Sequence, residues 1–179
     1  MEYELLDPDG PVLLTPKVFK DSRGFFMETF RDKDFREHCG NYTFVQDNQS
    51  KSSKNVLRGL HFQLKHPQGK LVRSIAGSVL DVCVDLRRES KNFGKSYLAV
   101  LDTENKRQLW IPPGFAHAFL VLSESAEFVY KCTDYYAPGD EATLLWNDPE
   151  LGIDWPCKEP ILSEKDLNGL LLKDCPCFE

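Results

Sequence analysis

The stretch Ser78-Val-Leu-Asp-Val-Cys-Val-Asp-Leu86 alternates between two sets of side chains. One set is wholly aliphatic, and the other carries the carboxylates of Asp81 and Asp85. A period of two residues is typical of a β-strand whose two faces meet different surroundings. We therefore expect a strand that packs its aliphatic face into a core and turns its aspartate face toward something polar.

Further short strands are expected around this stretch, because similar apolar runs are separated by glycine- and proline-rich turns. Helical signal is limited to a short segment after Thr29 and another that begins at Ser163. Many short strands at close spacing predict a mainly-β fold, a jelly-roll β-sandwich or barrel with a few short helices. The other expected strands are residues 69–77, 97–101 and 127–132, and the expected helix after Thr29 is 32–38.

Length and composition are those of an ordinary globular chain. The 179 residues predict a single domain, 1–179. The net charge of -6 argues against a broad nucleic-acid surface, which needs clustered lysine and arginine. No apolar run approaches the roughly 20 residues of a membrane helix, and the acidic N-terminus does not resemble a signal peptide. The six cysteines are irregularly spaced, so we expect reduced thiols and a cytoplasmic protein.

The segment Arg58-Gly-Leu-His-Phe-Gln63 holds the first candidate catalytic residue. If the segment is extended, Gly59, His61 and Gln63 share one face. His61 then lies beside a small residue, where a ligand can approach, and histidine is well suited to accept a proton near neutral pH. A lone histidine is more often structural, so this segment alone leaves both interpretations open.

The segment Trp110-Ile-Pro-Pro-Gly-Phe-Ala-His-Ala-Phe119 is similar to the second motif of the cupin superfamily. In metal-binding cupins the first motif supplies His-x-His and a later glutamate, whereas His61-Phe-Gln63 stands here. A zinc or iron site needs three or four suitable ligands. His61 and His117 alone are too few, so we expect a cupin-like fold without a metal.

Three further clusters suit a ligand, and equally suit ordinary surface or core positions. Arg23, within Asp21-Ser-Arg-Gly-Phe-Phe-Met-Glu28, has the planar fork that grips phosphate. The run Gln46-Asp-Asn-Gln-Ser50 offers donors and acceptors for a base or a sugar. Tyr130 and Tyr136 fall on one strand face by parity, and tyrosine can donate a proton or stack on a base.

Taken in order, these motifs resemble the dTDP-4-dehydrorhamnose 3,5-epimerase family, over nearly the whole chain. The resemblance implies a jelly-roll homodimer that needs no cofactor. Its implied substrate is a dTDP-4-keto-6-deoxyhexose, dTDP-4-dehydro-6-deoxyglucose, on the path to dTDP-L-rhamnose. The motifs are Asp21-Ser-Arg-Gly-Phe-Phe, Gln46-Asp-Asn, Arg58-Gly-Leu-His-Phe-Gln, Gly69-Lys, Asp81-Val-x-Val-Asp-Leu-Arg87, Pro112-Pro-Gly-Phe-Ala-His and Tyr130-Lys-Cys-Thr.

The resemblance also implies roles for single residues. His61 matches the proton-abstracting base, and Asp166 matches the carboxylate that orients it. Tyr130 matches the proton donor, and Lys70 matches the group that steadies the C4 oxyanion. Tyr136 matches the aromatic ring that stacks on thymine. The other implied substrate contacts are Arg23, Phe26, Glu28, Gln46, Asp47, Asn48, Arg58, His117, Glu141 and Lys165.

Two alternatives stay open beside this interpretation. One is a single-centre epimerase or 3,4-ketoisomerase on a related 4-keto sugar nucleotide. The other, of a different class, is a non-catalytic cupin that only binds a sugar nucleotide. A binding module has no use for an acid–base pair, so the presence of His61, Tyr130, Lys70 and Asp166 favours catalysis. The absence of a Gly-x-Gly-x-x-Gly fingerprint agrees with a reaction in which no hydride moves.

Overall fold

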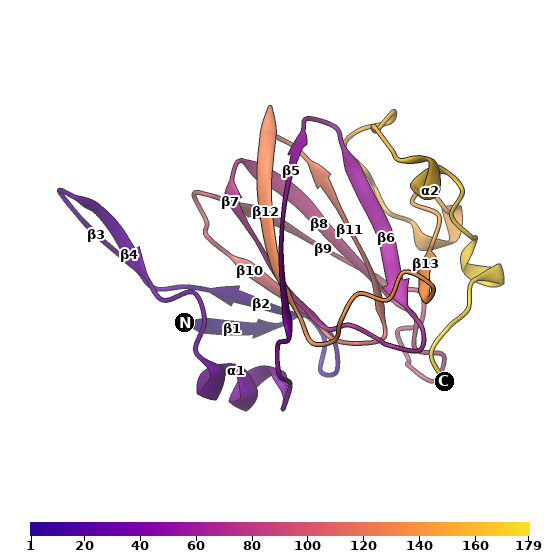
Figure 1. Ribbon diagram of the computed structural model, residues 1–179, viewed down its shortest axis with the longest axis horizontal. Helices are drawn as coiled ribbons and strands as arrows, with labels where there is room; N and C mark the ends of the chain where they lie inside the picture. The colour runs from indigo at the N-terminus through magenta and orange to yellow at the C-terminus, as the bar shows by residue number, and fades with distance from the viewer.

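Two antiparallel β-sheets face each other in the computed structural model, which describes residues 1–179 (Figure 1). The first sheet has the strand order β1-β2-β10-β7-β12-β5, and the second has the order β13-β6-β11-β8-β9. Most neighbouring strands are distant in sequence, as they are when a chain crosses repeatedly between the two layers of a jelly roll. The predicted mainly-β sandwich is confirmed.

The strands of the first sheet are β1 (Glu2–Leu5), β2 (Val12–Thr15), β10 (Gln108–Ile111), β7 (Lys70–Ala76), β12 (Ser125–Cys132) and β5 (Gln46–Ser53). Those of the second sheet are β13 (Glu141–Thr143), β6 (Leu57–Gln63), β11 (Phe115–Val121), β8 (Ser78–Asp85) and β9 (Ser96–Asp102). A separate hairpin pairs β3 (Val18–Asp21) with β4 (Gly24–Met27). The helices are α1 (Asp32–Cys39), α2 (Glu164–Leu167) and the 3-10 turns η1 (Pro149–Leu151) and η2 (Leu172–Asp174).

The alternating stretch 78–86 forms β8, and its two faces pack in two different layers. Leu80, Val82 and Val84 belong to a cluster of fourteen buried residues that includes Leu172 of the C-terminal segment. Val79, on the aspartate face, belongs to a cluster of thirteen that fills the space between the sheets. Each large apolar side chain buried in these layers contributes about 1.5–3 kcal/mol before the entropy of ordering is counted. The expected strands and the helix after Thr29 are present, whereas the helix after Ser163 has only four residues.

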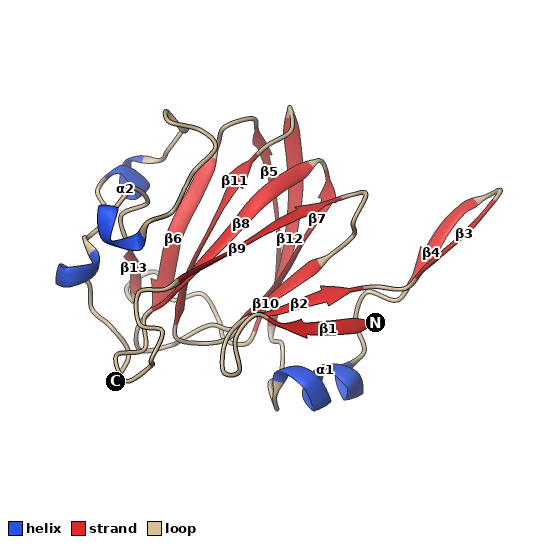
Figure 2. Cartoon of the chain, turned by 180° about the vertical axis from the view of Figure 1, so that it is seen from behind, coloured by secondary structure: helices blue, strands red, loops and turns tan.

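The C-terminal segment covers the outside of the second sheet beside β6 and β13, and it carries α2 (Figures 1 and 2). Its contact with β6 includes a parallel bridge between Val56, just before the strand, and Ile161. The segment therefore brings residues from the end of the chain to a wall made by residues near position 60.

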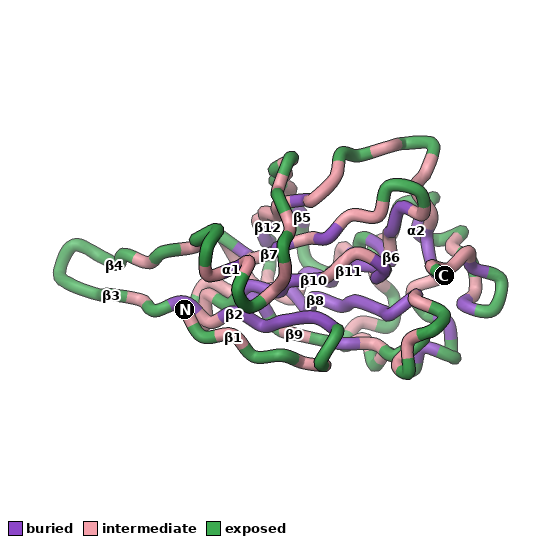
Figure 3. The backbone as a smooth tube through the Cα atoms, turned by 90° about the horizontal axis from the view of Figure 1, so that it is seen from below, coloured by how far each residue is buried: buried purple, intermediate pink, exposed green.

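The β3–β4 hairpin extends away from the sandwich at the opposite side of the molecule (Figures 1 and 2). Its backbone is largely exposed, in contrast to the buried strands of the sandwich (Figure 3). Phe19, Phe25 and Phe26 are each more than half exposed on it. None of the helices has the length and apolar character that a membrane crossing requires.

Candidate active site

A cavity of about 470 Å³ opens between the two sheets and the C-terminal segment. Its size lies within the roughly 300–1,000 Å³ that small-molecule sites occupy. The first and second sheets form opposite walls, and the turn around α2 forms part of the rim. Residues of the predicted site that line it are Arg58, His61, Lys70, His117, Tyr130, Lys165 and Asp166.

The position of His61 depends on a close approach between β6 and β11. Gly59 has a φ of 122°, and a Cβ there would lie 2.4 Å from the carbonyl oxygen of His117. Only glycine combines that backbone angle with that contact. The pairing of β11 with β6 shifts register between His117 and Phe119, which leaves His117 directly opposite His61. Both imidazoles therefore belong to the same wall.

His61 is held by a carboxylate from the far end of the chain. Its Nε2 lies 2.5 Å from Oδ1 of Asp166, which is almost fully buried. Ser163 caps α2 and donates from Oγ to Oδ2 of Asp166 at 2.7 Å. Burial alone would raise the pKa of Asp166, but the hydrogen bonds from His61 and Ser163 outweigh it and lower the pKa. The ionised carboxylate fixes the ring with Nε2–H donating, so the lone pair of the neutral imidazole lies on Nδ1.

His117 forms a second histidine–carboxylate pair deeper in the same wall. Its Nε2 lies 2.9 Å from Oδ2 of Asp81, and Asp81 is completely buried. The aspartate face of β8 therefore does meet a polar group at this position, as the alternation predicts. Asp85 meets a polar group as well, because it pairs with Arg87 at the end of the strand, away from the cavity lining.

Lys70 and Tyr130 project from the opposite wall. In the register of β7 and β12, Lys70 lies opposite Cys132 and Tyr130 lies opposite Val72, so their side chains point to the same inner face. Burial lowers the pKa of the Lys70 ammonium, which has no hydrogen-bonded carboxylate to offset it. Burial likewise raises the pKa of the Tyr130 phenol, which keeps its proton at neutral pH.

Glu141 and Lys165 form an ion pair of 2.8 Å at the rim, and Tyr136 donates its hydroxyl proton to Glu141 at 3.0 Å. Burial would raise the pKa of Glu141, but the hydrogen bond from Lys165 and the attraction of a protonated His61 lower it. His61 Nδ1 lies 3.9 Å from this carboxylate. The rim thus places a second negative charge close to the candidate base.

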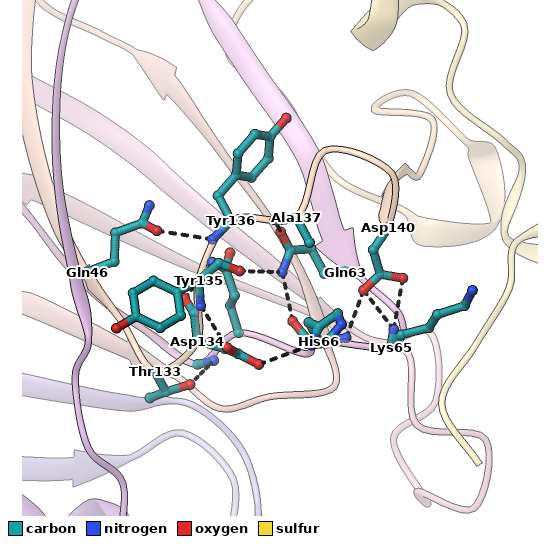
Figure 4. A network of polar contacts seen from close by, with 12 residues as sticks. Gln46, Gln63, Lys65, His66, Thr133, Asp134, Tyr135, Tyr136, Ala137 and Asp140 are labelled. Atoms are coloured by element: carbon teal, nitrogen blue, oxygen red, sulfur yellow. Dashed lines mark hydrogen bonds and ion pairs between the residues drawn. The ribbon is translucent and has the colours of Figure 1, made fainter.

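The loop that carries Tyr136 is held by a polar network at the cavity mouth (Figure 4). The side-chain oxygen of Gln46 accepts from the Tyr136 N–H at 3.0 Å, and that of Gln63 accepts from the Ala137 N–H at 2.7 Å. Asp140 accepts from the backbone of the segment that follows β6. Gln63, at the position where metal-binding cupins have a histidine, is therefore a loop anchor. No group of three or more His, Cys, Asp or Glu side chains is arranged around a metal position.

Eight of the predicted substrate contacts do not line this cavity. Four of them are linked by hydrogen bonds and an ion pair to Lys165 at its rim, namely Gln46, Asn48, Tyr136 and Glu141. The other four lie away from it. Arg23, Phe26 and Glu28 belong to the hairpin and the residues after it, and the Arg23 side chain is 87% exposed and paired with Asp21. Asp47 lies on the outer face of β5, where it pairs with Lys131 at 3.0 Å. The alternation of β5 explains the last case, because Gln46 and Asn48 point inward and the residue between them points outward.

Three residues to which the family resemblance assigned no role belong to the site. Asp81 pairs with His117, Ser163 supports Asp166, and Ser50 lines the cavity. Ser50 follows the inward parity of Gln46 and Asn48, so the strand pattern contained a signal for it. The pairing of Ser163 with Asp166 is local, and the helix start expected at Ser163 contained a signal for it, because a capping serine bonds the residue three positions further on.

The sequence profile described as dTDP-4-dehydrorhamnose 3,5-epimerase matches residues 6–174. The chain belongs to this family. An epimerase of that name from Pseudomonas aeruginosa is 56% identical over 169 residues, which cover 93% of each chain. The crystal structure of a dTDP-6-deoxy-D-glucose-3,5-epimerase from Legionella pneumophila, in complex with dTDP-4-keto-L-rhamnose, has a TM-score of 0.93 and 47% identity. That likeness covers 98% of this epimerase-family chain and 94% of the Legionella one.

A related protein with a different activity has the same fold. The structure of a 3′-monoepimerase from Streptomyces bikiniensis, in complex with dTDP-quinovose, has a TM-score of 0.86 and 35% identity. It covers 92% of this chain and 84% of its own. The fold of the family therefore accommodates both double and single epimerisation.

Proposed function

We propose that this protein is a dTDP-4-dehydrorhamnose 3,5-epimerase that inverts C3 and C5 of dTDP-4-dehydro-6-deoxy-D-glucose in dTDP-L-rhamnose biosynthesis. The observation that carries the proposal is the arrangement of the cavity. A carboxylate-held histidine lies on one wall, and a protonated tyrosine and a lysine lie on the other. Inversion at carbon needs proton removal on one face and proton return on the other, and two walls supply two faces.

The first step is removal of a proton beside the ketone by His61. The C4 carbonyl acidifies the hydrogens on C3 and C5, and loss of either gives an enolate. Asp166 holds the ring and stabilises the imidazolium that forms, as a buried carboxylate does in other histidine-based sites. His61 takes the proton, and the electron pair of the C–H bond moves into the enolate.

Lys70 stabilises the charge that this step creates. A buried ammonium without a carboxylate partner gains more from an arriving negative charge than one already paired. The enolate oxygen carries that charge only after the proton has left. The interaction therefore favours the transition state over the bound substrate, which is the kind of binding that accelerates a reaction.

Tyr130 completes the inversion from the opposite wall. Its raised pKa keeps the phenol protonated until the carbanion forms, and the proton then passes to carbon on the face away from His61. The same pair serves C3 and C5, because the two carbons flank one carbonyl. Between the two inversions His61 gives its proton to solvent and Tyr130 takes one from solvent, so both groups return to their starting states. Substrate binding is assigned to Arg58, His117, Glu141 and Lys165 around the cavity, with Gln46, Asn48 and Tyr136 at its mouth.

The proposal includes a homodimer. The hairpin residues Arg23, Phe26 and Glu28 lie outside the cavity of their own chain, and the hairpin exposes aromatic rings while projecting into solvent. A partner subunit that receives the hairpin would bury these rings and acquire the arginine for the diphosphate. The proposed location is the cytoplasm, where the six free thiols stay reduced.

Proton NMR of dTDP-4-dehydro-6-deoxyglucose incubated with the protein in deuterated water tests the proposal. We expect deuterium at C3 and at C5 together with the signals of the inverted sugar. Deuterium and inversion at one carbon alone would favour the single-centre epimerase, an alternative that the likeness to the Streptomyces monoepimerase keeps open. Binding without any exchange would favour the non-catalytic cupin.

A further inference from the structure

The inner face of β5 presents a ladder of polar side chains to the cavity, at every second residue. Gln46, Asn48, Ser50 and Ser52 share this face by the alternation of the strand. Three of them have a protein partner. Gln46 contacts Asn48 and the Tyr136 backbone, Asn48 donates to the sulfur of Cys132, and Ser52 accepts from Nε of Arg58 at 3.0 Å.

Ser50 is the exception in this ladder. Its hydroxyl is shielded from solvent and has no hydrogen-bond partner in the protein, although the residue lines the cavity. A buried hydroxyl without a partner costs about 1–3 kcal/mol, which makes such groups rare outside functional sites. A serine hydroxyl can also turn between staggered χ1 positions without moving the backbone. A ligand in the cavity can therefore supply the missing partner.

The register of the first sheet places Ser50 in line with the proposed catalytic groups. A cross-strand row is a set of inward-facing residues that lie opposite one another on neighbouring strands. Lys70 on β7 lies in the first of three successive rows, Tyr130 on β12 in the second, and Ser50 on β5 in the third. Each is one strand and one row further along, so the three form a diagonal across the inner face. The next inward residue of β5 is Ser52, which holds Arg58.

The order of the groups along the substrate matches the order of these residues along the inner face. Its C4 oxygen belongs at Lys70, its reacting carbons at Tyr130, and its diphosphate at Arg58. The polar ring substituent between the reacting carbons and the diphosphate-bearing C1 is the hydroxyl on C2. That hydroxyl keeps its configuration during the reaction, so a fixed side chain can bond it in substrate, enolate and product alike.

We propose that Ser50 hydrogen-bonds the C2 hydroxyl of the bound hexose and makes the enzyme selective for 2-hydroxy over 2-deoxy sugar nucleotides. A hydroxyl can both donate to and accept from another hydroxyl. A 2-deoxy substrate leaves Ser50 buried and unpaired, which is how a polar pocket rejects an analogue that lacks the matching group. This inference rests on the proposed function, because it assumes a 4-keto hexose in the cavity.

The test compares Ser50→Ala with wild type on two substrates, dTDP-4-dehydro-6-deoxyglucose and its 2-deoxy analogue, by the rate of solvent deuterium entry. We expect wild type to prefer the natural substrate by about tenfold in kcat/KM, as one neutral hydrogen bond allows. Ser50→Ala should lose about tenfold on the natural substrate, keep its rate on the 2-deoxy analogue, and show no preference. Its affinity for dTDP, which has no hexose, should be unchanged.

Ser74→Ala is the matched control. Ser74 lies in the same row as Ser50, on β7, but its hydroxyl is satisfied by the Ala76 carbonyl at 2.9 Å and it does not line the cavity. This variant should keep the wild-type preference. If Ser50→Ala kept the wild-type preference for the natural substrate over the 2-deoxy analogue, the inference would be overturned, but the proposed epimerase activity would stand. A wild type that exchanges no deuterium into either substrate would overturn the proposed function itself.

Discussion

The two walls of the cavity hold their polar groups in opposite ways. On the second sheet both histidines, His61 and His117, are tied to buried carboxylates at 2.5 and 2.9 Å. On the first sheet Lys70 and Tyr130 have no such partner, and burial is the main cause of their shifted pKa values. The second wall is therefore already paired and rigid, whereas the first is paired only when the substrate arrives.

In the proposed mechanism, this difference between the walls separates two tasks of the reaction. A base that removes a proton from carbon works better when its ring is held in one orientation and a carboxylate stabilises the imidazolium that forms. A cation stabilises an enolate more strongly when it has no other anionic partner before the enolate forms. The following experiments act on one wall at a time, in order of decreasing expected effect.

His61→Asn removes the base from the paired wall. We expect deuterium exchange at both C3 and C5 to fall by about 10³-fold or more, because one base serves both carbons. His66→Asn is the control, since this histidine lies nearby with an exposed side chain. Substantial deuterium at either carbon in His61→Asn would mean that a second base exists and that the paired wall is not the only source of proton removal.

Tyr130→Phe removes the acid from the unpaired wall and leaves the base intact. Proton abstraction and enolate formation should continue, so deuterium should still enter the sugar. Inversion should fall by about 10²–10³-fold, because the enolate regains its proton from the His61 side with retention. NMR separates exchange from inversion, and Tyr135→Phe, an exposed tyrosine, is the control. Normal inversion at C3 and C5 would contradict the division of labour between the walls.

Asp166→Asn loosens the paired wall without removing the base, and turnover should fall by about 10²-fold. The variant should also change the acid stability of the protein. The pKa of Asp166 is lowered in the folded chain, so its stabilisation is present above the pKa of an unfolded aspartate and is lost as pH falls through the folded value. Between about pH 5 and pH 2, the melting temperature should therefore fall less steeply with decreasing pH in Asp166→Asn than in wild type. The control is Asp174→Asn, because Asp174 is exposed. If the melting temperature of Asp166→Asn depended on pH as that of wild type does, the ionisation of Asp166 would not be linked to folding.

Arg58→Ala and Arg23→Ala test the binding of the diphosphate, which the proposal assigns to one arginine of the second wall and one of the hairpin. Each should weaken dTDP binding by about 1.5–3 kcal/mol, as charged hydrogen bonds do. Arg58 belongs to the cavity of its own chain and Arg23 to the protruding hairpin, so the two defects should complement each other between subunits. Mixing the two variants should restore about a quarter of the sites, by random pairing in a two-fold dimer. Unchanged dTDP affinity in both variants would contradict the assignment, and failure to complement would contradict the exchange of hairpins.

Dialysis against a chelator should have the smallest effect, because both histidines of the paired wall already use Nε2 to bond an aspartate. We expect activity to be unchanged, measured by the same exchange assay. Activity lost on dialysis and restored by one divalent ion would show that these pairs open to hold a metal.

The sequence by itself determined the fold class and the family. The alternation of 78–86 specifies a two-faced strand because side chains on an extended chain point to opposite sides in turn. The order of motifs from Asp21 to Asp166 identified the epimerase family, and with it His61, Tyr130, Lys70 and Asp166. The fold class and the family are confirmed because they depend on local periodicity and on residue identity, which are present in the sequence, whereas the roles of the four residues stay predictions.

Tertiary structure decided which of those residues meet. Asp166 is 105 positions from His61, and the C-terminal segment that joins them has no pattern that predicts its path. Asp47 matches a family position yet points outward, because its neighbours on β5 take the inner face. Ser50 belonged to a polar run that suited a ligand and an ordinary surface or core position equally, and only the packing of two sheets around its hydroxyl leaves it without a protein partner. Burial and pairing are properties of the assembled walls, so no single strand encodes them.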